Sequence, residues 1–220
     1  MKISQSLAGL CLVALLSACG GGGSGDAGQG TVGTQPSVPT NQLVPLARYT
    51  GPTGTFQQVN LKMPVSGIVD FSLQGTNVRI FDTAMNPVGQ GSFTPWGTYQ
   101  KNLVAGAYVV EFQYWSANSK HAIVYSPTLL AFGDLPQLRN AVYSSDVTTT
   151  TYYRASFATA STINSAGSGT EIGILDSNMN IVNYLALNSS VTLPAGDYIF
   201  RFMFWSANSK SVSITSPGLP

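Results

Sequence analysis

One short phrase of residues that could bind a ligand occurs twice in the chain. Trp-Ser-Ala-Asn-Ser-Lys occupies residues 115–120 and again 205–210. An indole offers a flat apolar face to a sugar ring, while amide and ammonium groups can hydrogen-bond to sugar hydroxyls. The candidate ligand-binding residues are therefore Trp115, Asn118, Lys120, Trp205, Asn208 and Lys210.

The strand before each phrase has a period-two pattern. Tyr198, Phe200, Phe202 and Phe204 are expected to face a core, so Arg201 and Trp205 belong to the opposite face. In the first copy that opposite face carries Glu111, Gln113 and Trp115. Because Glu111 and Arg201 are charged, the sequence predicts that this face is at least partly exposed to water.

Two interpretations of the repeated phrase remain open. A loop centred on Ala117-Asn118 predicts a hairpin, with Trp115 and Lys120 as cross-strand partners and the ammonium over the indole. The first interpretation is a structural turn held by this Trp–Lys pair. The second is a ligand-binding tip, favoured because six consecutive residues match while the flanking strands differ at most positions.

Motifs for catalysis and metal binding are weak. His121 is the single histidine, its counterpart in the second copy is Ser211, and no Gly-x-Ser-x-Gly phrase is present. Asp176–Asn180 begins like a calcium loop, but its twelfth position is Leu187, so a polar hairpin turn is predicted. We therefore expect no catalytic residue, no metal and no cofactor, and a protein that is not an enzyme.

An internal repeat defines the organisation of the folded part. Residues 108–127 and 198–217 are identical at ten of twenty positions at an offset of 90, and an upstream match has an offset of 94. A four-residue deletion in the second copy explains the change of offset. The sequence predicts a signal peptide at 1–18, a Gly/Pro/Ser-rich tether at 19–46, repeat 1 at 47–130 and repeat 2 at 131–220. The short join predicts that the repeats lie in fixed contact.

Both repeats are predicted to be all-β. Short period-two runs of β-branched and aromatic residues alternate with Gly, Asn, Asp and Pro, as in tandem antiparallel β-sandwiches of jelly-roll or Greek-key type. The phrase Leu-x-Ala-Gly-x-Tyr at 103–108 and 193–198, with Ile-Leu-Asp-Ser-Asn-Met-Asn at 174–180, resembles bacterial pre-peptidase C-terminal domains. That resemblance implies an accessory role such as substrate binding, although no enzyme precedes the repeats in this chain.

The N-terminal residues have the features of an export signal. Lys2 precedes an apolar stretch that is too short to span a bilayer. Leu16-Ser17-Ala18-Cys19 resembles the lipobox of bacterial lipoproteins, which implies cleavage before Cys19 and acylation of its thiol. Since Cys11 would leave with the signal, Cys19 would have no disulfide partner. Gly20 after the cysteine favours an outer-membrane location by resemblance to the sorting rule of enteric bacteria.

The charge composition argues against nucleic acid as a partner. Ten Lys+Arg face nine Asp+Glu, and removal of 1–18 takes Lys2 away and leaves nine against nine. Such a neutral chain, with 9% charged residues, has no basic patch for nucleic acid. The expected function is a non-catalytic binding module that is anchored to the membrane by its lipid, with a glycan or polysaccharide as ligand. The alternative is a structural or assembly lipoprotein that docks an envelope protein of a secretion or surface apparatus.

Overall fold

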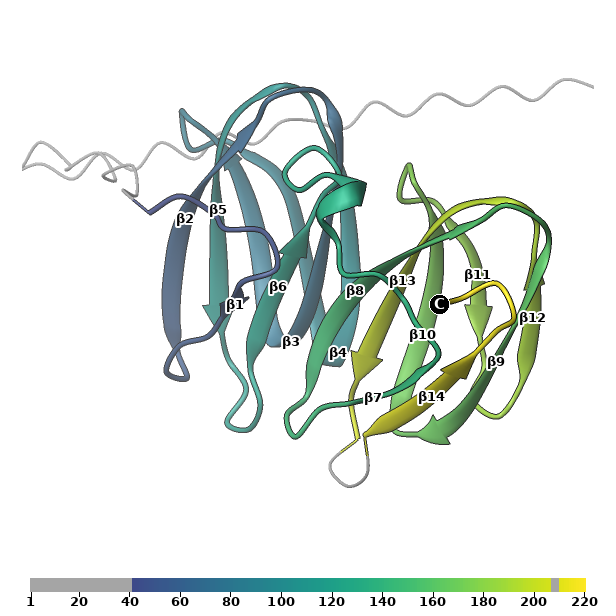
Figure 1. Ribbon diagram of the computed structural model, residues 1–220. Helices are drawn as coiled ribbons and strands as arrows, with labels where there is room; N and C mark the ends of the chain where they lie inside the picture. The colour runs from purple at the N-terminus through teal and green to yellow at the C-terminus, as the bar shows by residue number, and fades with distance from the viewer. Residues whose placement is uncertain (1–40, 207–209) are drawn as a thin grey trace, which may run out of the picture. The chain divides into compact units, whose positions relative to one another are not determined.

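The strands bury their side chains in two ways: residues 59–63 alternate between buried and less buried positions, whereas residues 198–204 are buried on both faces of their strand. The computed structural model describes residues 41–206 and 210–220. These residues fall within a single compact unit, and their strands form two neighbouring groups that follow each other along the chain (Figure 1). The prediction of two tandem antiparallel β-sandwiches is confirmed.

Repeat 1 contains six strands. Their bounds are β1 (Arg48–Tyr49), β2 (Thr55–Met63), β3 (Gly67–Asp82), β4 (Pro87–Leu103), β5 (Gly106–Tyr114) and β6 (His121–Tyr125). The sheet order is β1-β6-β3-β5-β2, with β4 paired to β3. The first half of β3 pairs with β6 and its second half with β5. The register shifts between these halves, next to Gly75, so that one strand contributes to both layers of the sandwich.

Repeat 2 separates these layers completely. After the 3-10 helix η1 (Phe132–Asp134) come β7 (Ala141–Ser144), β8 (Thr149–Phe157), β9 (Ser161–Ser168), β10 (Thr170–Asp176), β11 (Ile181–Leu185), β12 (Ser190–Leu193), β13 (Gly196–Phe204) and β14 (Ser211–Thr215). They form one sheet of order β11-β10-β13-β8 and a second of order β12-β9-β14-β7. The break between β9 and β10 at Gly169 corresponds to Gly75 within β3.

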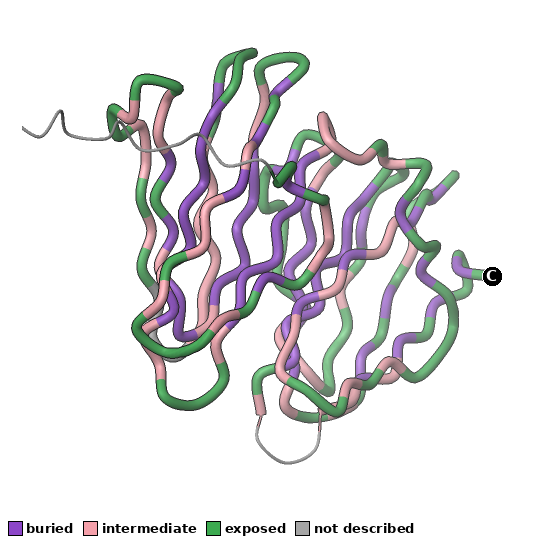
Figure 2. The backbone as a smooth tube through the Cα atoms, turned by 90° about the vertical axis from the view of Figure 1, so that its left-hand side faces the viewer, coloured by how far each residue is buried: buried purple, intermediate pink, exposed green. Residues whose placement is uncertain are grey.

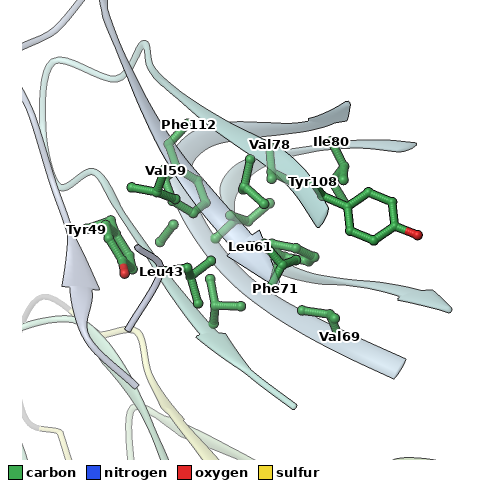
Figure 3. Packing of buried hydrophobic residues seen from close by; sticks show 14 of the residues in the cluster. Leu43, Tyr49, Val59, Leu61, Val69, Phe71, Val78, Ile80, Tyr108 and Phe112 are labelled. Atoms are coloured by element: carbon green, nitrogen blue, oxygen red, sulfur yellow. The ribbon is translucent and has the colours of Figure 1, made fainter. Parts of the chain in front are cut away.

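Each repeat has its own apolar core. In repeat 1 the labelled side chains, among them Leu61, Phe71 and Phe112, gather between the strands (Figure 3). In repeat 2 the predicted core face of β13 is confirmed, since Tyr198, Phe200, Phe202 and Phe204 all belong to the core cluster. Burial runs along the strands while most turns are exposed (Figure 2). Each buried Phe or Leu side chain contributes roughly 1.5–3 kcal/mol to folding.

The repeated Leu-x-Ala-Gly-x-Tyr phrase has a structural function. The Tyr108 hydroxyl donates to the Val104 carbonyl at 2.9 Å, and the Tyr198 hydroxyl donates to the Pro194 carbonyl at 3.1 Å. Such a bond from a tyrosine to the backbone a few residues upstream fixes the entry into a core strand of a sandwich. The motif that carried the resemblance therefore stabilises the start of β5 and of β13.

A short strip of chain before each repeat lines its edge strand. The Leu43 N–H donates to the Asn60 carbonyl of β2 at 2.7 Å, and the Leu138 N–H donates to the Arg154 carbonyl of β8 at the same distance. Leu43 is only 5% exposed and belongs to the core of repeat 1. The predicted tether of 19–46 is thus too long, because the folded chain already includes Asn41–Leu43.

The repeats pack against each other through a third apolar cluster. It joins Ile123 and Tyr125 of β6 to Tyr152, Leu175 and Ile199 of repeat 2. The rings of Tyr125 and Tyr152 lie 4.9 Å apart between centroids. The two repeats are therefore in direct side-chain contact, as the short join between them predicts.

A buried ion pair lies in the same interface. Arg201 Nη1 donates to Asp70 Oδ2 at 2.9 Å, and the Tyr152 hydroxyl donates to the same oxygen at 3.0 Å. The Arg201 side chain is 1% exposed and that of Asp70 is fully buried. The prediction of a wet face was wrong for Arg201, because repeat 1 covers this part of β13. Glu111 is also buried, beneath Arg79 and Gln58 of its own repeat.

Candidate ligand-binding site

Each repeated phrase begins at a glycine corner where the chain crosses between layers. The N–H groups of Trp115 and Ser116 both donate to the Gly75 carbonyl at 3.2 Å. In repeat 2 the N–H groups of Trp205 and Ser206 donate to the Gly169 carbonyl at 3.0 and 3.3 Å. Both glycines have positive φ, 51° and 64°, a backbone conformation that glycine adopts without strain. This shared crossing gives the start of both phrases the same backbone geometry.

The predicted hairpin at the phrase is wrong. β5 pairs with β2 and β3, whereas β6 pairs with β1 and β3. The strands that flank residues 115–120 therefore lie in different layers, and Trp115 and Lys120 are not cross-strand partners. The pattern of residues was correct for strands, but it contained no information about which strands pair.

The predicted site residues have different surroundings. The half-buried Trp115 donates its indole N–H to Asn77 Oδ1 at 2.9 Å, while Asn118 is exposed. Lys210 directs its ammonium to the Asp146 carbonyl at 3.3 Å. The cations over aromatic rings in the described residues are both Arg79, over Phe56 and Phe81, and the expected Lys–indole contact is not among them. Asn208 lies outside the described residues.

Of the two tryptophans in the repeated phrases, Trp205 is exposed and Trp115 is half-buried. Trp205 is 44% exposed and its ring stacks on Trp96, with centroids 6.1 Å apart and planes 14° apart. Trp96 belongs to β4, opposite Gln74. The four extra residues of repeat 1 keep β4 continuous where repeat 2 divides into β11 and β12. Trp96 of repeat 1 thereby meets Trp205 of repeat 2.

Beside these two rings lies an open groove of about 610 Å³, which we call the Trp205 groove. It is lined by Trp96, Thr170, Glu171, Ile172, Tyr184, Leu185, Ala186, Leu187 and Trp205. Tyr184, on the edge strand β11, is 52% exposed. Three aromatic side chains from β4, β11 and the end of β13 therefore meet at one groove, with a carboxylate among them.

Glu171 is the one charged residue in this lining. Burial raises the pKa of its carboxyl, and the nearby Arg201 guanidinium opposes this rise. The ion pair of Arg201 is with Asp70 across the interface, and Arg201 makes no direct bond to Glu171. Among the described residues Glu171 has neither a side-chain hydrogen bond nor an ion pair. A partly desolvated, unpaired carboxylate in a groove is a feature of functional sites.

Repeat 1 has an equivalent groove of about 470 Å³, which we call the Phe56 groove. It is lined by Phe56, Asn77, Val78, Arg79, Gln90, Gly91, Ser92 and Gln113. The strand registers show the equivalence. The pair Asn77 and Gln113 in repeat 1 corresponds to Glu171 and Met203 in repeat 2. The pair Arg79 and Gln90 corresponds to Gly173 and Tyr184.

The charges of the Phe56 groove are already paired. Arg79 Nε donates to Glu111 Oε1 at 2.8 Å, and Gln58 donates to the other oxygen of this carboxylate at 2.8 Å. Asn77 donates to Gln113 at 3.1 Å and accepts from Ser92 at 2.6 Å. The two grooves occupy the same place on the two sandwiches, but only the Trp205 groove has an unpaired charge.

The repeated Asp turns are structural. Asp176 Oδ1 accepts the N–H groups of Asn178 and Asn180, both at 2.9 Å, and Asp82 does the same for Ala84 and Asn86. These bonds close the β10–β11 and β3–β4 connections, which confirms the predicted polar hairpin turn. In the described residues no group of three or more His, Cys, Asp and Glu side chains gathers as metal ligands would.

His121 is buried at the start of β6. Its Nδ1 lies 3.4 Å from Arg48 Nη2. Burial, helped by the Arg48 charge, lowers the pKa of this imidazole from 6.5 to about 4. The ring is therefore neutral at physiological pH and is held within the fold rather than presented to a ligand.

Residues of the predicted export signal and Cys19 lie outside the described part of the chain. Within that part, no helix has the length and hydropathy of a membrane span.

The sequence reasoning missed Phe56, Trp96, Glu171 and Tyr184 as groove residues. The offset of 94 places Glu171 level with Asn77. No local pattern distinguishes Tyr184 from other exposed strand residues.

Comparison with known proteins gives distant structural likenesses. No protein-family model matches the chain, and no curated protein matches its sequence. A solved protein from Eubacterium rectale, described as secreted, is similar with a TM-score of 0.29 and 12% identity, over 73% of this chain and 68% of that one. The CUB1-EGF-CUB2 domain of human MASP-1/3 is similar with a TM-score of 0.26 and 8% identity, over 75% and 94%. The fold assignment rests on the strands and sheets described above.

Proposed function

We propose that the chain is a non-catalytic lipoprotein of the cell envelope that binds a glycan. The observation that carries this proposal is the Trp205 groove, an open channel lined by three aromatic rings with hydroxyl and carboxylate groups beside them. It contains Trp205, one of the residues that the sequence singles out. Trp115, the equivalent residue in repeat 1, is half-buried and bonded to Asn77, so it supports the fold more than it offers a surface.

Aromatic lining suits a sugar ring for a physical reason. A pyranose has an apolar face of C–H groups and a rim of hydroxyls, so it gains by covering an exposed ring while its rim keeps polar partners. Trp205 and Tyr184 each retain about half of their surface for such a contact. Glu171 supplies a carboxylate to the lining of the same groove.

The envelope setting is part of the proposal. Acylation of Cys19 would tie the repeats to a membrane, with the outer membrane favoured by Gly20. One acyl chain binds a membrane only reversibly, so the several chains carried by bacterial lipoproteins are needed for stable anchoring. The resemblance to pre-peptidase C-terminal domains agrees with a binding role that needs no catalytic centre.

A glycan array with the full chain in detergent micelles tests this function. We expect signal from the parent protein, loss of signal in Trp205→Ala, and retention in a Trp115→Ala variant that is still folded by circular dichroism. The Trp115 variant is the matched control, since it removes the same side chain outside the Trp205 groove. A blank array for the parent, or equal signal from the parent and Trp205→Ala, would refute the proposed site.

The second candidate function is docking of an envelope protein. It is favoured by β11, a sheet-edge strand on which Ile181 and Val182 are 42% and 47% exposed. An unprotected edge with apolar side chains can accept another strand. A photo-crosslinker at Val182 that captures one envelope protein in cells, and a blank glycan array, would favour this alternative.

A further inference from the structure

The Trp205 groove is unbalanced in charge. Glu171 carries a negative charge, and no cationic side chain is among the lining residues. The guanidinium of Arg201 acts on the Glu171 carboxyl, but it is buried and paired with Asp70. A ligand that enters the groove therefore meets one unpaired carboxylate between aromatic rings.

Both features favour a positive charge on the ligand. A carboxylate that has lost part of its hydration gains when a cation replaces the missing water, and this attraction is stronger than in bulk water. The faces of indole and phenol rings also attract ammonium groups through their quadrupoles. Trp96, Trp205 and Tyr184 supply such faces beside Glu171.

We propose that the Trp205 groove selects glycan units that carry a free amino group, with the sugar ring on the aromatic side chains and its ammonium on Glu171. This inference rests on the proposed glycan-binding function and names the class of sugar. N-acetylation of the same sugar removes the positive charge and adds a methyl group, so an acetylated oligomer loses the contact with Glu171.

The Phe56 groove provides an internal contrast. Its guanidinium is paired with Glu111, and its amides bond to each other, so it has no free carboxylate. The selectivity for an ammonium group therefore belongs to repeat 2 alone, and it depends on one residue.

Calorimetric titration of the full chain with two trisaccharides tests the inference. One is built of glucosamine and the other of N-acetylglucosamine, at a pH where the sugar amines are protonated. We expect the parent protein to bind the glucosamine trimer about tenfold more tightly, as partial desolvation of opposite charges predicts. The preference should shrink as salt is added, because exposed charges are screened.

Two variants identify the source of the preference. Glu171→Gln keeps the shape of the side chain and should bind the two trimers equally. Asp134→Asn removes one negative charge from η1, outside both grooves, and should keep the parent's preference. If Asp134→Asn lost the preference as well, net charge rather than Glu171 would be responsible and the inference would be wrong.

The outcomes separate this inference from the function on which it rests. Equal binding of both trimers by the parent, abolished by Trp205→Ala, would overturn the amino-sugar preference and leave glycan binding intact. Binding of neither trimer alongside a positive array with other glycans would have the same meaning. Failure with every glycan would overturn both.

Discussion

The outer faces of β5 and β13 are equivalent in sequence but have opposite surroundings. In repeat 1 the face keeps its groove open, and Glu111 is paired by Arg79 of the same repeat. In repeat 2 much of the face is covered by repeat 1, and Arg201, at the position of Glu111, is paired by Asp70 across the interface. One duplicated position has therefore acquired opposite charges, because each copy meets a different neighbour.

The largest expected effect comes from breaking the ion pair of repeat 2. Arg201→Ala leaves the Asp70 carboxylate buried without a cation, which should cost about 3–5 kcal/mol of stability. Arg79→Ala in repeat 1 should cost at most about 1 kcal/mol, since that arginine is half-exposed. Urea unfolding of the parent and both variants measures the difference. A double variant, Asp70→Leu with Arg201→Met, should recover most of the loss; equal losses in the two single variants would contradict the comparison.

The next effect concerns pH and distinguishes the repeats, because repeat 1 has His121 where repeat 2 has Ser211. His121 has a folded-state pKa of about 4 against 6.5 when unfolded, so protons bind the unfolded chain first as the pH falls. Its contribution to stability is present above about pH 6.5 and is lost as the pH falls through 4, a change of about 3 kcal/mol. His121→Gln should lack this part of the pH dependence, measured by urea unfolding across the range. Curves of parent and variant that stay parallel would show that His121 does not titrate in this way.

A third effect tests the glycine corner at Gly75, which repeat 2 shares at Gly169. A Cβ at Gly75 would lie 2.3 Å from the Ser116 Cβ and 2.7 Å from the Ser119 carbonyl oxygen, on a backbone with φ of 51°. Gly75→Ala should therefore cost about 2 kcal/mol. Gly133→Ala is the control, because nothing lies within 4 Å of its Cβ position. Thermal unfolding that ranks these two variants in the opposite order would mean that the corner is not tightly held.

The smallest effect tests a feature in which the repeats agree. Tyr108→Phe and Tyr198→Phe each remove one hydroxyl bond to an upstream carbonyl and keep the ring in its core. Each should cost about 1 kcal/mol, the usual net value of one hydrogen bond. Similar losses in the two variants would confirm equal roles, and unequal losses would show where the repeats have diverged.

The sequence predicts those features of the fold that depend on the pattern of neighbouring residues. The all-β class and the core face of β13 follow from period-two alternation, and the repeat follows from identity at fixed offsets. What it does not predict depends on distant partners. Arg201 was assigned to a wet face because its partner Asp70 lies 131 residues away.

The candidate site shows the same limit. The sequence singled out Trp205, but the groove around it needs Trp96 from the other repeat and Tyr184 from a neighbouring strand. The hairpin expected at Trp115–Lys120 failed because alternation says which residues face a core and not which strands pair.

The strip that lines β2 has a mechanical consequence for the proposed anchored protein. If Cys19 is acylated as proposed, tension between that anchor and a glycan held in the Trp205 groove would enter repeat 1 at Asn41 and reach repeat 2 through the covalent join and the contact between Asp70 and Arg201. The bonds between Asn60 and the backbone of Asn41 and Leu43 carry that load first. Both bonds are made by the one residue Asn60, so the resistance of the fold to tension from the proposed lipid anchor would depend on that single position of β2.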